Sequence, residues 1–214
     1  MLDGLGSRRI GGPEVTLSVV FSGRDPASGV WIGRDRWPGQ SGPWRQDKGN
    51  RHVTDARLSQ ALFSPRRIAP IGASTDASRL TARAQVYLRR HGFTGDLFPV
   101  NPLADVVLRD KAYPTLRDVP GPIDFAYIQV NTQNVETAIQ DCAVRDVPVV
   151  CVLADGFAEA GPDGVALQSR ILATAREAGI RLLGPNSIGV INVPAAIACS
   201  VNAVLEAETL IPGR

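Results

Sequence analysis

The residues best suited to chemistry form a short turn of small side chains at residues 72–77, with the sequence GASTDA. The turn follows an apolar run at residues 68–71, and a helical pattern begins a few residues later. Backbone N–H groups at a helix start are unpaired and carry partial positive charge, so such a turn can hold a phosphate. The hydroxyls of Ser74 and Thr75 add donors, and Arg79 can neutralise phosphate charge. The alternative is an ordinary strand–helix turn without a ligand.

Apolar runs alternate with amphipathic patterns along the chain, and this alternation predicts an α/β fold. Strands are expected at residues 67–72, 96–101, 123–130, 147–154 and 181–184, and helices at residues 55–63, 78–90, 133–145 and 162–178. The strand starts lie 24 to 34 residues apart, which is the size of a βαβ unit. Because the strands are apolar runs, both faces of the sheet should be covered. The expected fold is an open, mostly parallel five-stranded sheet with helices on both faces, and with an irregular connection before the third strand.

Composition separates residues 1–53 from the rest of the chain. This segment holds 14 Gly or Pro residues, all three tryptophans and one short strand-like run at residues 15–21. We expect an irregular, disordered extension here and a single domain over residues 54–214. Interleaved basic and aromatic residues in the extension would alternatively suit single-stranded nucleic acid. Residues 54–214 hold 15 Lys or Arg against 16 Asp or Glu, which argues against nucleic acid as a partner of the domain.

The apolar stretches, cysteines and histidines of the chain indicate its cellular compartment and whether it binds a metal. No apolar stretch approaches the ~20 residues of a membrane span, so no membrane association is expected. Cys142, Cys151 and Cys199 lack CxxC spacing and indicate buried free thiols in a reducing compartment, which predicts a cytoplasmic location. With only His52 and His91, the chain lacks the residues for a serine triad or a metal site, and no bound metal is expected.

Two features argue against a dinucleotide ligand. The turn after the first strand lacks GxGxxG, and the second strand ends in Val100-Asn101-Pro102 instead of the acidic residue that binds the ribose of NAD. An NAD(P)-binding oxidoreductase-type domain is therefore only the second hypothesis, an alternative to the preferred one. Asp155 and Glu159 are a carboxylate pair of the kind used in acid–base catalysis, but a solvated loop is the preferred interpretation, and no catalytic residue is assigned.

Five motifs occur in the order LFSPRRIAPIGAS, HGFTGDLFPVNP, AYPTLRDVPGPID, VLADGFAEAG and RLLGPNSIGVIN. Together they resemble the CoA-binding domain of the NDP-forming acyl-CoA synthetases, which are relatives of the succinyl-CoA synthetase α-subunit and include the ADP-forming acetate–CoA ligases. The resemblance covers about residues 58–214 and implies a Rossmann-like domain that binds CoA or acyl-CoA at the strand ends. The candidate CoA-binding residues are Gly72, Ala73, Ser74, Thr75, Asp76, Ala77, Arg79, Pro102, Leu103, Val130, Asn131, Leu153, Ala154 and Asp155.

Complete members of this family join a carboxylate to CoA with ATP or GTP. They use a phosphohistidine in a second domain and a nucleotide site in an ATP-grasp module. Neither histidine of this chain matches the phosphohistidine position, and the sequence ends about where the second domain would begin. The resemblance therefore implies an N-terminal fragment without ligase activity by itself, whose partners are the remaining synthetase domains or a separate ATP-grasp subunit. The same sequence would also suit a ligand-free interaction subunit or a gene remnant.

Three departures from the family pattern matter, and the two at phosphate contacts predict weak CoA binding. Pro70 lies inside the first strand, where it removes a ladder hydrogen bond. Residues 79–82 read RLTA where the family often has Lys-x-Gly-Gly, and Leu103 replaces a frequent lysine. The charge of Arg79 remains, but the close approach of glycine backbone to a phosphate is lost.

Overall fold

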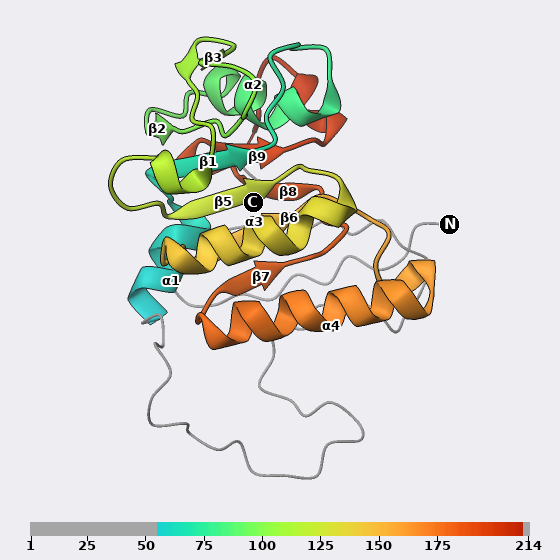
Figure 1. The fold of residues 1–214 in the computed structure, drawn as a ribbon. Helices are drawn as coiled ribbons and strands as arrows, with labels where there is room; N and C mark the ends of the chain where they lie inside the picture. Colours follow the sequence, from blue (N-terminus) through green and yellow to red (C-terminus); the bar gives the residue numbers. More distant parts are fainter. Residues whose placement is uncertain (1–54, 212–214) are drawn as a thin grey trace.

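Five parallel strands form the central sheet of the computed structural model, which describes residues 55–211 (Figure 1). The strands are β1 Arg67–Ile71, β2 Asp96–Leu97, β5 Phe125–Ile128, β6 Val149–Val152 and β7 Arg181–Leu183. They lie in the order β2-β1-β5-β6-β7, and every neighbouring pair is parallel. The predicted five-stranded parallel sheet is therefore confirmed. The extension expected at residues 1–53 and its strand-like run lie outside the described residues.

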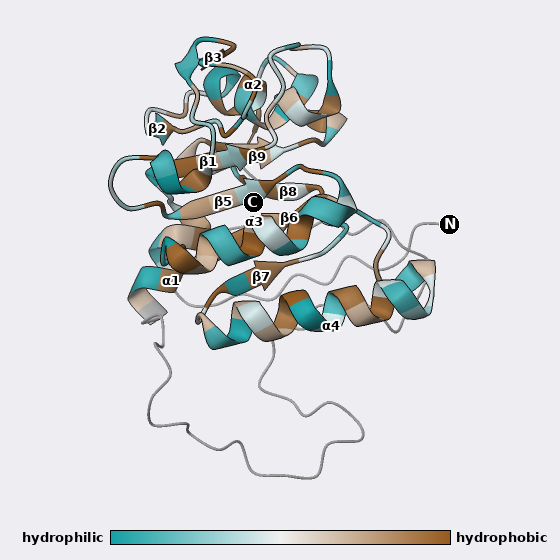
Figure 2. Cartoon of the chain, viewed as in Figure 1, coloured by the Kyte–Doolittle hydropathy of each residue, from teal (hydrophilic) through white to brown (hydrophobic). Residues whose placement is uncertain are grey.

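Helices cover both faces of this sheet, as the apolar strands predicted. They are α1 Asp55–Phe63, α2 Arg83–Arg90, α3 Thr132–Val144 and α4 Pro162–Glu177. Helices α3 and α4 pack on one face in a cluster that includes Ile128 and Val150. Helices α1 and α2 pack on the other face in a cluster that includes Ile68 and Tyr127. In Figure 2, hydrophobic and hydrophilic stretches alternate along α3 and α4, as expected of amphipathic helices that cover a sheet.

The helix predicted over residues 78–90 begins later than the sequence suggested. A 3-10 turn, η1 Leu80–Ala82, comes first, and the α-helix α2 starts only at Arg83. The cause is a local turn, because the carboxylate of Asp76 accepts hydrogen bonds from the N–H and the hydroxyl of Ser78. Arg79 is then extended, with φ −76° and ψ 148°. The predicted helix start at about residue 78 was therefore wrong by five residues for the α-helix.

Two hairpins were missed by the sequence prediction. Strands β3 Val106–Val107 and β4 Asp110–Lys111 form one of them, inside the connection expected to be irregular. Strands β8 Gly189–Asn192 and β9 Ile197–Ser200 form the other, which packs with α1 and α2 on the same face of the sheet. Strands of two residues leave no periodic signal, and antiparallel pairing of β8 with β9 depends on a contact that residues 189–200 make only in the folded chain.

Pro70 is accommodated because its ring faces the edge of the sheet. The carbonyls of Ile68 and Pro70 accept hydrogen bonds from Phe98 and Val100, and the N–H of Gly72 donates to Val100. In a parallel ladder, successive residues direct their N–H and C=O groups toward opposite neighbouring strands, and residues 68, 70 and 72 direct theirs toward the β2 side. The N–H that Pro70 lacks would therefore point toward the carbonyl of Phe98. Strand β2 is the edge strand and already ends at Leu97, which leaves the ladder to β5 intact. The expected loss of a ladder bond therefore falls where the sheet is least regular.

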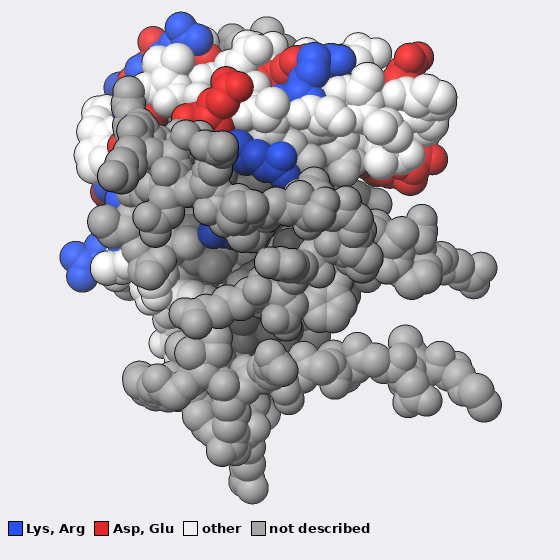
Figure 3. Space-filling view, turned by 90° about the horizontal axis from the view of Figure 1, so that it is seen from below, with Lys and Arg blue, Asp and Glu red and all other residues white. Residues whose placement is uncertain are grey.

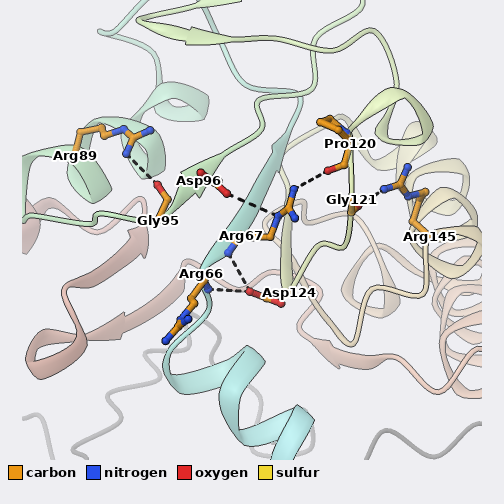
Figure 4. A network of polar contacts seen from close by, with 9 residues as sticks. All are labelled: Arg66, Arg67, Arg89, Gly95, Asp96, Pro120, Gly121, Asp124 and Arg145. Carbon is orange, nitrogen blue, oxygen red and sulfur yellow. Dashed lines mark hydrogen bonds and ion pairs between the residues drawn. The ribbon is translucent and has the colours of Figure 1, made fainter.

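Polar contacts fix the amino ends of the central strands, opposite the edge where ligands of such sheets bind (Figure 4). The carboxylate of Asp124 accepts hydrogen bonds from the N–H groups of Arg66 and Arg67, at 2.8 and 3.0 Å. The guanidinium of Arg67 donates to the carbonyl of Pro120 at 2.7 Å and lies 3.9 Å from Asp96. These contacts therefore join β1, β2 and the segment before β5 at the start of the strands.

Both signs of charge occur on the face of the described residues that Figure 3 shows. In the view of Figure 3, basic and acidic side chains of the described residues are interspersed among uncharged ones. Between Asp55 and Ile211, none of the helices is both long and apolar enough for a membrane span.

Candidate functional site

The site is defined by the reversal of strand order in the sheet. Strand β1 lies between β2 and β5. The chain leaves β1 through α2, on one face, and leaves β5 through α3, on the other face. The loops after β1 and β5 therefore diverge, and in open α/β sheets ligands bind outside the carboxyl ends of the strands at such a switch point. The candidate residues of the first, third and fourth strand loops lie along this edge.

The turn after β1 depends on Gly72. Its φ is +84°, and a Cβ atom at this position would lie 2.8 Å from Cγ1 of Val130. Only glycine has this conformation at low cost and lets the two loops approach so closely. The carbonyl of the next residue, Ala73, accepts a hydrogen bond from Nδ2 of Asn101 at 2.9 Å. The turn is thus tied to the loops after both neighbouring strands.

The polar groups of residues 74–79 are partly engaged with one another. The N–H of Asp76 donates to Oγ of Ser74 at 3.1 Å, while Ser78 donates to the Asp76 carboxylate through its N–H and hydroxyl. These two donors from Ser78 and the nearby Arg79 guanidinium lower the pKa of Asp76, so the carboxylate is ionised at neutral pH. Within the described part of the chain, the N–H groups of Ser74, Thr75 and Ala77 donate no hydrogen bond.

This arrangement differs from the phosphate site that the sequence predicted. Three N–H groups and the exposed hydroxyl-bearing Thr75 remain for a ligand, but the dipole of α2 starts several residues away. Asp76 places a negative charge beside the same turn, and Arg79, whose Nε lies 3.7 Å from Asp76, partly offsets it. A phosphate at this turn would be held mainly by backbone N–H groups and Arg79.

The loop after β2 presents an apolar side chain to solvent. The N–H of Leu103 donates to Oδ1 of Asn101 at 2.8 Å, which closes a local turn at Pro102. The side chain of Leu103 is 93% exposed. A large exposed apolar residue at a predicted ligand edge suits contact with an apolar part of a ligand or with another protein surface.

The loops after β5 and β6 are bonded to each other. Asn131 is the N-cap residue of α3, and its side chain makes no capping hydrogen bond. The hydroxyl of Thr132 donates to the carbonyl of Asp155 at 2.7 Å. The N–H of Leu153 donates to Ile128, in β5, and the carbonyl of Ala154 accepts from the turn at residue 186. Val130, Leu153 and Ala154 are half-buried, whereas Asn131 and Asp155 are exposed.

A carboxylate organises the rest of the loop after β6. Oε1 of Glu159 accepts hydrogen bonds from the N–H groups of Gly156 and Phe157, at 2.7 and 3.2 Å. Partial burial raises the pKa of Glu159, but the backbone donors outweigh it, and the net pKa lies below its ordinary value. Glu159 is therefore an ionised residue that holds the backbone of this loop in place.

The structure thus brings together loops that lie far apart in the sequence. Ala73 is bonded to the loop after β2, Gly72 lies against Val130, and the loops after β5 and β6 share the Thr132 bond. Sequence reasoning missed Gln129, which closes β5 at this edge and is 6% exposed. Its signal was a single polar residue at the end of an otherwise apolar run. Within residues 55–211, His, Cys, Asp and Glu side chains form no group of three or more that suits a metal ion.

Comparison with known proteins gives concordant results. Residues 66–193 match the family model described as CoA binding domain. Acetate–CoA ligase [ADP-forming] II of Archaeoglobus fulgidus is 37% identical over 131 residues, which are 61% of this chain and 20% of that protein. Acetate–CoA ligase [ADP-forming] I subunit alpha of Pyrococcus furiosus is 31% identical over 158 residues, which are 72% and 33% of the two proteins.

A solved structure is similar over the same region. It is the dinucleotide forming acetyl-coenzyme A synthetase 1 of Ca. Korarchaeum cryptofilum, in complex with phosphate and ADP. The TM-score is 0.67 at 33% sequence identity, over 72% of this chain and 32% of that chain. This chain therefore spans only about a fifth to a third of the length of these relatives.

Proposed function

The chain belongs to the CoA-binding domain family, and from this premise we propose that it binds CoA or acyl-CoA at the switch point between β1 and β5. The family confirms the resemblance drawn from the five motifs. The observation that carries the proposed site is the Gly72 turn, where positive φ and the contact with Val130 bring two loops together at the carboxyl ends of adjacent strands. The diphosphate of CoA would lie at this turn, against the N–H groups of Ser74, Thr75 and Ala77.

The wider activity is proposed by similarity to longer relatives. These include proteins named as ADP-forming acetate–CoA ligases. We infer that the parent reaction joins a carboxylate to CoA with ATP, releasing ADP and phosphate. The phosphohistidine domain and the ATP-grasp module, or a separate subunit that carries it, would be the partners of this chain. The proposed CoA site lies within the described residues, and phosphoryl transfer would need those partners.

Calorimetric titration of the full 214-residue chain with CoA tests the ligand. We expect saturable binding that weakens with added salt, because phosphate charge contributes to it. NADH serves as the comparison ligand, since the segment after β2, residues 98–103, contains Asn101 but lacks the acidic residue that a nicotinamide dinucleotide needs. Absence of heat and of a thermal shift at millimolar CoA, or a shift with NADH alone, would contradict the proposal.

An arginine pair tests where the phosphates lie. Arg79→Ala should weaken CoA binding roughly fivefold, or about 1 kcal/mol, because an exposed guanidinium beside the turn is lost. Arg117→Ala is the matched control, since Arg117 is also exposed but pairs with Asp141 near the opposite edge of the sheet. Equal affinities for the two variants would place the phosphates elsewhere.

A chain without a ligand would behave differently in these experiments. An interaction subunit would show no CoA binding alone, and ligase activity would appear only after mixing with an ATP-grasp protein. A gene remnant would show neither.

A further inference from the structure

Gln129 is a buried polar side chain whose hydrogen-bonding capacity is unused. Within residues 55–211, both Oε1 and Nε2 of Gln129 are buried without a partner. Gln85 and Asn192, the other buried amides with unpaired atoms in this region, each leave only one atom unpaired. A buried amide that forms no hydrogen bond costs free energy, so such a residue calls for a specific explanation.

The position of Gln129 is the ligand edge of the sheet. It directly follows β5, and its N–H donates to the carbonyl of Ile71 at 2.8 Å. A Cβ atom on Gly72 would lie 3.2 Å from the carbonyl carbon and oxygen of Gln129. Gln129 therefore lies at the carboxyl end of β5, beside the end of β1, and the connections of these two strands diverge where an open α/β sheet takes its ligand.

The side chain of Gln129 lies on the α2 face of the sheet. Side chains alternate along a strand, and Phe125 and Tyr127 belong to the cluster formed with α1 and α2. Ile128 and Val130 belong to the cluster on the α3 face. Gln129 thus continues the row of Phe125 and Tyr127, below the turn that follows β1.

The chemistry of a carboxamide restricts what it can pair with. Its oxygen accepts and its NH₂ donates, so a complementary ligand offers both a donor and an acceptor. The pantetheine arm of CoA contains two trans secondary amides, each with an N–H and a carbonyl on opposite sides of the amide bond, so the carboxamide can accept from an amide N–H of this arm or donate to one of its carbonyls. The nucleoside half of a ligand at such a switch point lies toward the end of the second strand. Here β2 and Gln129 are on opposite sides of β1.

We propose that the carboxamide of Gln129 pairs with a secondary amide of the pantetheine arm of CoA. This assignment rests on the proposed CoA site and adds the direction in which the ligand lies: adenosine toward β2 and the pantetheine arm toward β5. It also explains why a polar residue occupies the last buried position of an apolar strand.

Titration of the full chain and of Gln129→Met with three ligands tests this assignment. The ligands are CoA, 4′-phosphopantetheine and adenosine 3′,5′-bisphosphate. Methionine keeps the length of the side chain and removes both hydrogen-bonding atoms. We expect affinity for CoA and for 4′-phosphopantetheine to fall about tenfold, equivalent to ~1.4 kcal/mol, with no change for adenosine 3′,5′-bisphosphate.

The melting temperature of the unliganded variants gives a second readout. Gln129→Met should melt no lower than the parent chain, because an unpaired buried amide has been removed. Tyr127→Phe is the matched control, since its buried hydroxyl also has no partner within the described residues but lies two residues deeper on the same face. Its CoA affinity should equal that of the parent. If Gln129→Met does not fold, Gln129→Asn keeps the amide and retracts it by one methylene, and a severalfold loss is expected.

The outcomes separate this inference from the proposed function. Parent and Gln129→Met chains that bind CoA and 4′-phosphopantetheine equally well would overturn the role of Gln129 and leave the CoA site standing. Weakening confined to adenosine 3′,5′-bisphosphate would reverse the ligand direction and overturn the assignment. A parent chain that binds none of the three ligands would overturn the proposed function and this inference together.

Discussion

Replacing Gly72 with alanine tests the geometry on which the site depends. Gly72 and Gly92 share the same φ of +84°. A Cβ atom at residue 92 would meet no described atom within 4 Å, whereas at residue 72 it would lie 2.8 Å from Cγ1 of Val130. Gly92→Ala is therefore a matched control that carries the backbone strain without the collision.

The expected losses of unfolding free energy follow from the backbone strain at positive φ and from the Cβ collision. Left-handed backbone costs an alanine roughly 1–2 kcal/mol, and both variants carry this cost. A forced contact in a packed region adds about 1–3 kcal/mol at residue 72 alone. Gly72→Ala should lower the free energy of unfolding by roughly 2–5 kcal/mol, and Gly92→Ala by roughly 1–2 kcal/mol.

Urea denaturation followed by circular dichroism measures both values, with an unchanged m-value as the check that the unfolding reaction is the same. A Val130→Ala background removes the Cγ1 atom and should recover on the order of 1 kcal/mol of the Gly72→Ala loss. The carbonyl of Gln129, 3.2 Å from the same Cβ position, would prevent full recovery. Two glycine variants that differ by less than about 0.5 kcal/mol would refute the close approach of the two loops.

Three further results are expected. An NMR titration should give Asp76 a pKa below its ordinary value of 3.8. The contribution of this carboxylate to stability is then fully present above pH 3.8 and is lost as the pH falls through the pKa of the folded state. An Asp76 pKa at or above 3.8 would contradict the turn. The three thiols are buried, and burial raises the pKa of Cys151 to about 12. A thiol reagent at about pH 8 should therefore label the chain only after denaturation. Rapid labelling of the native chain would show that the core packing is wrong. Glu159→Ala should destabilise the domain by about 1 kcal/mol, since Gly156 and Phe157 lose their acceptor; a Glu136→Ala control removes an exposed ion pair with Arg170 and should cost less.

Several elements could be predicted from the sequence because their signals are local. Helix α1 begins and ends at the predicted residues, since an amphipathic pattern runs from Asp55 to Phe63 and a proline follows at residue 65. Helix α4 begins at Pro162 as predicted, because proline suits a first helical turn. The apolar runs located all five strands of the sheet, although the structure has them shorter by one to four residues. The motif order also identified the family.

Other features were decided only by the tertiary structure, because they depend on what lies next to a residue in space. The start of α2 was displaced by the Asp76 carboxylate, which bonds Ser78 in a turn that helical periodicity cannot register. The β8–β9 hairpin gained stability from antiparallel pairing and from its contact with α2.

Pro70 and Gln129 show the same difference between what the sequence reveals and what only the tertiary structure decides. The sequence reveals a proline in a strand and an amide at the end of one. Only the strand order shows that the proline faces an edge strand and that the amide is buried at the switch point. Local periodicity fixes which residues become strands and helices, whereas desolvation and strand order fix which side chains lie at the site, and these depend on contacts between distant residues.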